Sequence, residues 1–212
     1  MHFKVQRREQ ENTQDDWGNT AILVVDIQND FCDDEGIFAK QGLDIKPVQE
    51  VAKRIDEFLV EARKLGVPII FSKQVESAEV TPLNLQRQFY RGKLKEVCSP
   101  GSWGSDFYRI KPSGNETVIE KYTYDVFSNP ELKRILDKQG IKTLVVTGVN
   151  TDICVDTTVR SAFTNGYQIV VPHDLVGTMN KEAQEHFLAV FDRSFGDVTD
   201  AQSTLSRLQL DV

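Results

Sequence analysis

The alternation of apolar runs and amphipathic segments along the chain predicts strands and helices in turn. Short apolar, β-branched runs are typical of buried parallel strands, and apolar residues spaced three and four apart are typical of helices. The expected strands span residues 21–25, 67–71, 117–120, 143–146, 167–171 and 195–198. The expected helices span residues 47–65, 129–136, 181–191 and 201–208, and a further helix begins near Cys154. This alternation favours a three-layer α/β/α domain with a mainly parallel sheet.

The same pattern sets the expected domain organisation. Residues 1–19 are polar and predict an N-terminal arm, and residues 20–212 predict one domain, because this length holds one sizeable core. Residues 26–44, rich in acids and glycine, are expected to form a loop. Residues 72–114 lack periodicity and contain three prolines and several aromatic residues. Long segments of this kind are usually functional, so we expect an insertion that covers the substrate.

Three of the expected strands lead into a residue that can do chemistry. Asp26 follows the first strand and Lys121 the third, while Thr147-Gly148 is expected to end the fourth shortly before Cys154. The carboxyl ends of parallel strands lie at one edge of a sheet, where open α/β sheets bind ligands. A thiol at a helix N-terminus lies at the positive end of the helix dipole, so we expect Cys154 to favour the thiolate.

These three side chains suit nucleophilic catalysis. The Lys121 ammonium would stabilise both a thiolate and the ionised Asp26. Asp26 would accept the thiol proton and return it to a leaving amine. Backbone N–H groups at the turn into the helix could hold the oxyanion of a tetrahedral intermediate. The pattern predicts attack of Cys154 on an amide-type carbonyl, followed by hydrolysis of the thioester.

Charge and composition narrow the possible partners. The formal net charge of −7 argues against a general nucleic-acid binder. No apolar run has the length of a membrane span, and the N-terminus lacks the apolar stretch of a signal peptide. Three widely spaced cysteines give no disulfide framework and favour a cytoplasmic setting. Only three histidines occur, without CxxC or HxxxH spacing, so we expect neither a metal nor a cofactor.

Around the three reactive positions the sequence resembles the isochorismatase-like hydrolases, a superfamily of cysteine hydrolases. The matching pieces are VVDIQNDF at 24–31, IEKYTYDVF at 119–127 and TGVNTDICVDTTVRSAF at 147–163. Three separated motifs in the right order are far more specific than any one of them. The resemblance implies the isochorismatase-like, Rossmann-like fold and a homo-oligomer, either a dimer or a tetramer.

The resemblance also implies roles for individual residues. Asp26, Lys121 and Cys154 would form the catalytic triad. A cis peptide bond would join Val149 to Asn150, and the backbone amides of Asn150 and Cys154 would form the oxyanion hole.

Departures from particular members of the superfamily indicate the reaction. Nicotinamidases carry a metal-binding Asp-x-His after the second strand, and the corresponding stretch here, SKQVESAEVTPLNLQ, contains no histidine. Isochorismatases proper, which hydrolyse a vinyl ether, typically lack the cysteine that stands here at 154. Residues 98–107 are most similar to amidohydrolases of small ureido or carbamoyl compounds, such as ureidoacrylate, biuret, triuret or N-carbamoylsarcosine. We therefore expect C–N bond hydrolysis with release of ammonia, and a vinyl ether hydrolase is the alternative.

Several residues near these motifs are candidates for binding the small-molecule substrate. The candidates are Gln28, Phe31, Trp103, Tyr124 and Phe127. An aromatic residue in a loop near a reactive edge often forms a pocket wall. The same aromatic residues are also compatible with a place in the core.

Two other classes of function are compatible with parts of the pattern. Cys154 and Arg160 have the Cys-x5-Arg spacing of cysteine phosphatases, but the intervening VDTTV contains no glycine to shape a phosphate-binding loop. A non-catalytic binding scaffold of the same fold is the other alternative. Loss of a triad residue would be its signature, and all three are present.

Overall fold

The computed structural model describes residues 17–92, 96–114 and 116–210. Most of the predicted N-terminal arm, residues 1–16, lies outside the described residues. Trp17 is buried in the core, and the Asn19 carbonyl accepts a hydrogen bond from the Lys142 N–H at 2.8 Å. Residues 17–19 therefore pack onto the domain just before its first strand.

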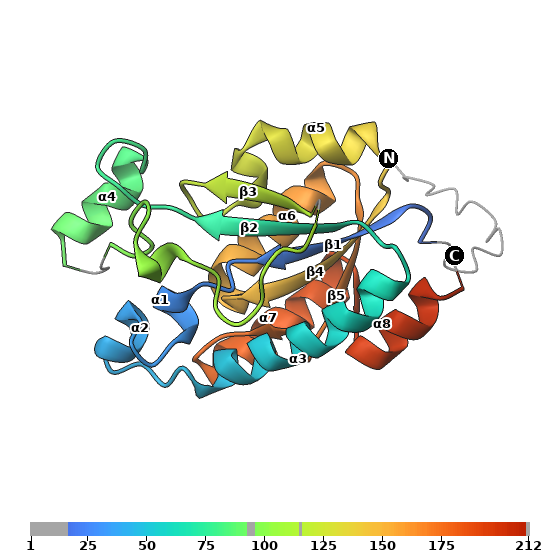
Figure 1. Cartoon of the computed structure of the whole chain (residues 1–212), viewed down its shortest axis with the longest axis horizontal. Coiled ribbons are helices and arrows are strands. Elements are labelled where there is room, and N and C mark those ends of the chain that lie inside the picture. Colours follow the sequence, from blue (N-terminus) through green and yellow to red (C-terminus); the bar gives the residue numbers. More distant parts are fainter. Residues whose placement is uncertain (1–16, 93–95, 115, 211–212) are drawn as a thin grey trace, which may run out of the picture.

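A seven-stranded parallel sheet forms the centre of the molecule (Figure 1). The strands are β1 (Thr20–Val25), β2 (Ile69–Gln74), β3 (Thr117–Lys121), β4 (Thr143–Val149), β5 (Gln168–Pro172), β6 (Val176–Gly177) and β7 (Asp197–Thr199). Their order is β3-β2-β1-β4-β5-β7, with β6 paired to β4. The order reverses direction between β1 and β4, which is the position where open α/β sheets form a ligand-binding crevice.

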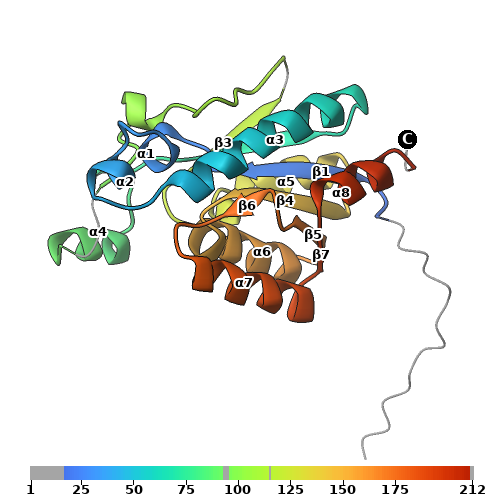
Figure 2. The ribbon, with the colours of Figure 1, turned by 90° about the horizontal axis from the view of Figure 1, so that it is seen from below.

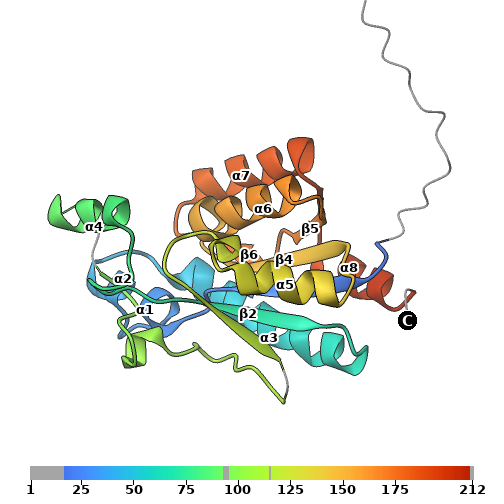
Figure 3. The same cartoon turned by 90° about the horizontal axis from the view of Figure 1, so that it is seen from above.

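Helices cover both faces of this sheet. The helices are α1 (Asn29–Cys32), α2 (Ile37–Lys40), α3 (Lys46–Lys64), α4 (Leu83–Tyr90), α5 (Pro130–Lys138), α6 (Asp156–Thr164), α7 (Lys181–Ser194) and α8 (Ala201–Leu208). Helices α3 and α8 lie on one face, and α5, α6 and α7 lie on the other (Figures 2 and 3). The predicted three-layer α/β/α architecture is confirmed. Within the described ranges, no helix is long and apolar enough to cross a membrane.

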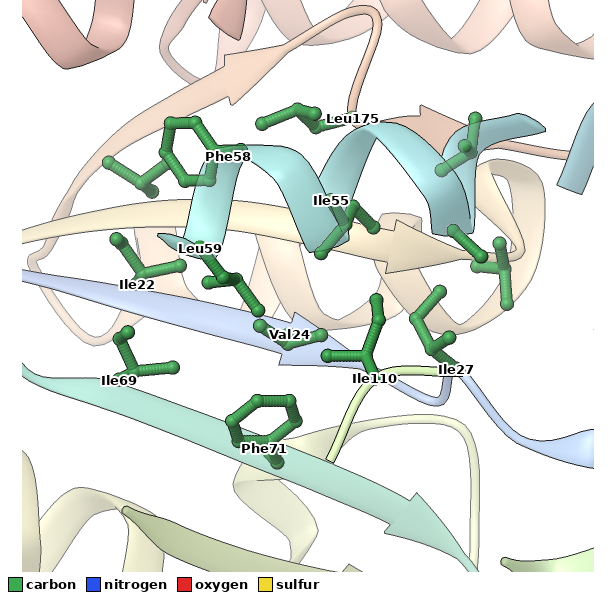
Figure 4. Packing of buried hydrophobic residues seen from close by; sticks show 14 of the residues in the cluster. Ile22, Val24, Ile27, Ile55, Phe58, Leu59, Ile69, Phe71, Ile110 and Leu175 are labelled. Atoms are coloured by element: carbon green, nitrogen blue, oxygen red, sulfur yellow. The ribbon is translucent and has the colours of Figure 1, made fainter. Parts of the chain in front are cut away.

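Strand β1 separates the two halves of the core. Ile22 and Val24 pack toward α3, where Figure 4 shows them near Leu59 and Ile55. The alternate residues of β1 belong to the second half, with α5, α6 and α7. Because both faces of the sheet are covered, all six residues of the strand are buried. This double burial accounts for the unbroken apolar run in the sequence.

Two expected strand ends are wrong. Strand β2 continues past residue 71 because Ser72 and Gln74 remain paired with β3, with Gln74 opposite Lys121. Strand β4 does not end at Thr147-Gly148 but runs to Val149, where β1 and β6 pair with it. Helix α7 likewise runs three residues past its expected end, to Ser194, and the other expected ends agree with the structure to within two residues.

Some short elements were not predicted. The segment 26–44, expected as a loop, contains α1 and α2, and the segment between β2 and β3 contains α4. Figure 1 shows α4 projecting from the body of the domain beyond the ends of β2 and β3. One or two helical turns are too short to show a helical period in the sequence.

Candidate active site

Three strands deliver the predicted reactive side chains to one edge of the sheet. Asp26 follows the last residue of β1 and has a φ of 52°, a left-handed conformation that Asp tolerates better than most residues. Lys121 is the last residue of β3. Cys154 lies beyond β4 on a single π-helical turn, Thr151–Val155, that leads into α6. The convergence predicted from the sequence is therefore present in the fold.

Lys121 contacts both of the other side chains. Its Nζ lies 2.7 Å from Asp26 Oδ2 and donates a hydrogen bond to Cys154 Sγ at 3.6 Å. The Asp26 carboxylate is near enough to Cys154 to raise the pKa of its thiol. Asp26, Lys121 and Cys154 are 0%, 1% and 5% exposed. An ammonium, a carboxylate and a thiol thus share one water-poor site, where charges interact strongly.

The environment of Cys154 favours the protonated thiol. Burial raises the pKa of Cys154 well above its ordinary value; the Lys121 ammonium opposes this rise, and the Asp26 carboxylate adds to it. The expectation of a resting thiolate is therefore wrong, because burial outweighs both the helix dipole and the nearby ammonium. The protonated thiol instead lies near Asp26, the group that could accept its proton.

Lys121 is held in its charged form. Burial alone would lower the pKa of its ammonium, but Asp26 and Cys154 raise the pKa above its ordinary value. The ammonium also donates hydrogen bonds to Gln74 Oε1 at 2.6 Å and to the Thr123 carbonyl at 3.0 Å. These partners make Lys121 a fixed positive charge beside the thiol.

Strand β2 supplies polar groups that the sequence reading missed. Ser72 Oγ donates a hydrogen bond to Asp26 Oδ1 at 2.6 Å, and Gln74 contacts Lys121. Both side chains are buried, as is Glu76 just beyond the strand. A polar residue at every second position, from 72 to 76, was the available signal, since alternate residues of a strand share a face.

The turn between β4 and the helix has the backbone features expected for an oxyanion hole. The peptide bond between Val149 and Asn150 is cis, as predicted. Gly148, with a φ of 117°, allows β4 to approach β1 closely, because a Cβ there would collide with the Val25 carbonyl. The Asn150 and Cys154 amides remain predicted oxyanion donors.

Two of the residues predicted to contact the substrate have structural roles instead. Gln28 is fully buried; its Nε2 donates hydrogen bonds to the backbone oxygens of Gln74 and Ser105, and its Oε1 accepts one from the Gln74 N–H. Phe31 packs in the core, with its ring 5.0 Å from that of Phe38. We do not retain either residue as a substrate contact.

The other three predicted contacts differ in their positions. Tyr124 is half-buried and packs against the half of the core that contains Cys154. Burial raises the pKa of its phenol, and the nearby Cys154 raises it further. Phe127 packs against Tyr167, with ring centroids 5.7 Å apart, in the second half of the core. Trp103 is half exposed on a turn of the β2–β3 segment. Of these three, Tyr124 is therefore the candidate that its electrostatic interaction with Cys154 favours most.

Asp30 anchors the β2–β3 segment beside the site. Its Oδ2 accepts a hydrogen bond from the Cys98 N–H at 2.7 Å, and its Oδ1 accepts one from the Ile37 N–H at 3.3 Å. A side chain at Gly104 would overlap its carboxylate. One buried acid thus holds the start of α2 and two points of the predicted insertion together.

The Cys-x5-Arg spacing does not form a phosphate-binding loop. The residues between Cys154 and Arg160 are helical. The Arg160 guanidinium bonds to Asp156 at 2.8 Å and lies over the Phe195 ring at 4.7 Å. Because its guanidinium is paired with Asp156 and Phe195, Arg160 is not placed to bind a phosphate at Cys154. Among the described residues, no cluster of three or more His, Cys, Asp or Glu side chains could hold a metal ion.

Comparison with known proteins assigns the fold and the motifs to a family. The model of the isochorismatase domain matches residues 20–203. The chain belongs to the isochorismatase family. It is therefore a hydrolase of that family, as the resemblance in its motifs predicted.

Individual isochorismatase-family relatives agree in length and fold. The ureidoacrylate amidohydrolase RutB of Pantoea ananatis is 29% identical over 195 residues, which cover 85% of this chain and 78% of the relative. A cysteine hydrolase from Pseudomonas syringae pv. phaseolicola has a TM-score of 0.81 at 20% identity, covering 92% of this chain and 94% of that one. N-carbamoylsarcosine amidase from Thermoplasma acidophilum has a TM-score of 0.70 at 23% identity, covering 87% and 97%. The two structures bear on the fold, which they share with this chain.

Proposed function

We propose that the protein is a cysteine-dependent amidohydrolase that releases ammonia from a small amide or from a ureido or carbamoyl compound. The observation that carries the proposal is the position of the Lys121 ammonium, 2.7 Å from the Asp26 carboxylate and 3.6 Å from the Cys154 sulfur. A buried proton acceptor, cation and thiol in contact are the parts that thiol acylation needs. Similarity to a ureidoacrylate amidohydrolase supports the ureido class.

The first half of the reaction forms a thioester. Asp26 accepts the thiol proton as the Cys154 sulfur attacks the carbonyl carbon, and Lys121 balances the negative charge as it moves from sulfur to oxygen. The amides of Asn150 and Cys154 stabilise the oxyanion. Asp26 then gives the proton to the leaving nitrogen, the C–N bond breaks, and ammonia departs.

The second half restores the thiol. A water molecule gives a proton to Asp26 and attacks the thioester carbonyl, which forms a second oxyanion at the same amides. The C–S bond breaks, and the proton on Asp26 returns to the sulfur. The net change is the addition of one water across the C–N bond, giving an acid and ammonia. A vinyl ether hydrolase would leave this Cys154 chemistry without a use.

Ammonia release from a substrate panel tests the proposal. The panel contains ureidoacrylate, biuret, triuret, N-carbamoylsarcosine, maleamate and nicotinamide, and Cys154→Ala is the control. We expect ammonia from at least one ureido compound with the wild type, none with the variant, and no effect of a chelator. Equal turnover by Cys154→Ala would contradict the covalent mechanism. Loss of activity on chelation, restored by zinc, would favour a metal-dependent amidase instead.

We also propose that the enzyme acts in the cytoplasm as a homo-oligomer. The resemblance of its motifs to the superfamily and the three free cysteines in the described chain support these two points. Sedimentation of the full chain would measure its assembly state, and a monomer at micromolar concentration would contradict the second point.

A further inference from the structure

A row of buried polar side chains continues from the triad along β2. Lys121 Nζ donates a hydrogen bond to Gln74 Oε1 at 2.6 Å, and Gln74 Nε2 donates one to Glu76 Oε1 at 2.9 Å. Glu76 Oε2 accepts the Val97 N–H at 3.0 Å. Gln74 is 1% exposed and Glu76 is 3% exposed. A buried acid with no part in the triad is thus connected to the catalytic lysine through a single amide.

Glu76 and Lys121 together determine which way that amide points. A glutamine side chain has an acceptor end and a donor end, and the Lys121 ammonium, which only donates, favours the acceptor end. An ionised carboxylate only accepts, and both oxygens of Glu76 receive an N–H, one from Gln74 and one from Val97. The amide nitrogen of Gln74 is therefore directed to Glu76, and its oxygen is directed to Lys121.

The oriented oxygen completes the set of acceptors around the ammonium. Lys121 has three N–H donors, and it donates hydrogen bonds to Gln74 Oε1, to the Thr123 carbonyl and, at 3.6 Å, to Cys154 Sγ. The Asp26 carboxylate adds an ion pair at 2.7 Å. With one acceptor for each donor, the ammonium has a defined position beside Cys154 Sγ. Reversal of the Gln74 amide would put an NH₂ group against the ammonium and push it away.

We propose that Glu76 is a positioning residue that, through Gln74, holds Lys121 at the distance at which it lowers the cost of the Cys154 thiolate. The inference rests on the proposed role of Cys154 in that the thiolate is the reactive species. It assigns to Glu76 no contact with the substrate and no proton transfer.

A direct effect of the Glu76 charge on Cys154 would change the pKa of Cys154 in the opposite direction from the positioning effect. A nearby negative charge disfavours a thiolate, so removal of that charge alone would lower the pKa of Cys154. Loss of the positioning effect would raise it, because the ammonium would move away from the sulfur. The direction of the change in Glu76→Gln therefore separates the two effects.

Glu76→Gln is expected to reverse the direction of the hydrogen bonds in the row. The Val97 N–H is a fixed backbone donor, so the single oxygen of the new amide faces it, and the new NH₂ group faces Gln74. The Gln74 side chain can rotate, and it then presents its oxygen to residue 76 and its NH₂ group to Lys121. The variant keeps the size and shape of the buried side chain.

The measurement is the rate of Cys154 alkylation by iodoacetamide at a fixed pH below the Cys154 pKa, followed by peptide mass spectrometry, which needs no substrate. We expect Glu76→Gln to slow alkylation about tenfold, which corresponds to a rise of about one unit in the pKa of Cys154. In a Gln74→Met background we expect an equal slowing that Glu76→Gln does not increase. The matched control Glu96→Gln removes an exposed neighbouring acid, and it should be alkylated at the wild-type rate.

Four results would overturn the proposal. They are faster alkylation in Glu76→Gln, an effect of Glu76→Gln that persists in the Gln74→Met background, an equal slowing in Glu96→Gln, and an unchanged rate in Gln74→Met. Circular dichroism shows which variants fold, and Gln74→Met alone breaks the same connection if Glu76→Gln does not fold. Because no turnover is measured, failure of this inference is distinct from an inactive substrate panel.

Discussion

Strand β3 has an ion pair at each end, and the two pairs are in different environments. At its carboxyl end Lys121 pairs with Asp26 at 2.7 Å, and both side chains are fully buried. Just before its first residue Glu116 pairs with Arg63 of α3 at 2.8 Å, and these side chains are 12% and 27% exposed. The chemistry of the two contacts is nearly the same, so the difference between them is burial.

Burial makes the first pair costly. Removing two charges from water costs several kcal/mol each, and their attraction often fails to repay it. The second pair is partly hydrated, and a bidentate ion pair of this kind stabilises the folded protein by about 1 kcal/mol or less. A protein that kept Lys121 and Asp26 only for stability would gain by replacing them with apolar residues. The comparison supports a catalytic reason for the buried pair.

The largest effect should come from breaking the buried pair. Lys121→Met leaves Asp26 buried without its partner, which should cost about 3 to 5 kcal/mol in the free energy of unfolding. Turnover should fall on the order of 10³-fold, because the thiolate loses its cation. Urea unfolding and ammonia release measure the two losses. A stability loss below that of Arg63→Ala would contradict the comparison.

Replacing both members of the pair should separate stability from activity. In the double variant Asp26→Leu with Lys121→Met, no charge remains unpaired, so the free energy of unfolding should return to within about 1 kcal/mol of the wild type or exceed it. The double variant should stay inactive. Urea unfolding of the four members of this mutant cycle gives the coupling energy, and a double variant less stable than Lys121→Met would refute the interpretation.

The two pairs should lose their contributions to the free energy of unfolding at opposite ends of the pH scale. The pKa of Lys121 is raised above 10.5, so its contribution is complete below that pH and is lost as the pH rises through the folded-state value. Burial raises the pKa of Glu116, but hydrogen bonds from Arg63 and Ser113 outweigh this and lower it below 4.5. Its contribution is therefore complete above 4.5 and is lost as the pH falls through the folded-state value.

Unfolding free energies against pH test this opposition. Above pH 10.5, wild type should lose stability relative to the double variant that lacks Asp26 and Lys121. Below pH 4.5, wild type should lose its advantage over Arg63→Ala. Curves that stay parallel at both ends would show that neither pair contributes through its charge.

The smallest effect should come from the partly buried pair of Arg63 and Glu116. Arg63→Ala should lower the free energy of unfolding by about 1 kcal/mol or less, and 1 M salt should reduce the difference between variant and wild type. Turnover should change by less than about twofold, because the pair lies at the far end of β3 from Cys154. A larger loss of activity would mean that the segment before β3 controls the site.

The sequence predicted what depends on strands and their ends. Buried apolar runs place Asp26 and Lys121 at one edge of the sheet. The carboxyl ends of parallel strands lie at the same edge, and this does not depend on the conformation of the connecting loops. The sequence could not predict the position of Gln74 or Glu76, because the register of β2 against β3 and the path of the segment after it set their partners. The protonation of Cys154 also escaped prediction, because burial outweighed the helix dipole that the local sequence suggested.

The aromatic candidates show the same limit. Phe31 and Phe127 stand next to motif residues in the sequence, yet their rings pack into the two halves of the core. Proximity along the chain fixes a backbone position, and packing decides the direction of the side chain. Tyr124 lies near Cys154 because the turn after Lys121 brings it there.

The central claim is that Cys154 becomes acylated during turnover, and mass spectrometry of the quenched enzyme tests it most directly. The enzyme is mixed with the most active compound of the panel, quenched in acid within the first turnovers, and digested. The account predicts an acyl or carbamoyl adduct on the peptide that contains Cys154, absent from Cys154→Ala, with release of ammonia at a matching rate. Turnover by Cys154→Ala, or an adduct on Cys32 or Cys98 in its place, would contradict the account.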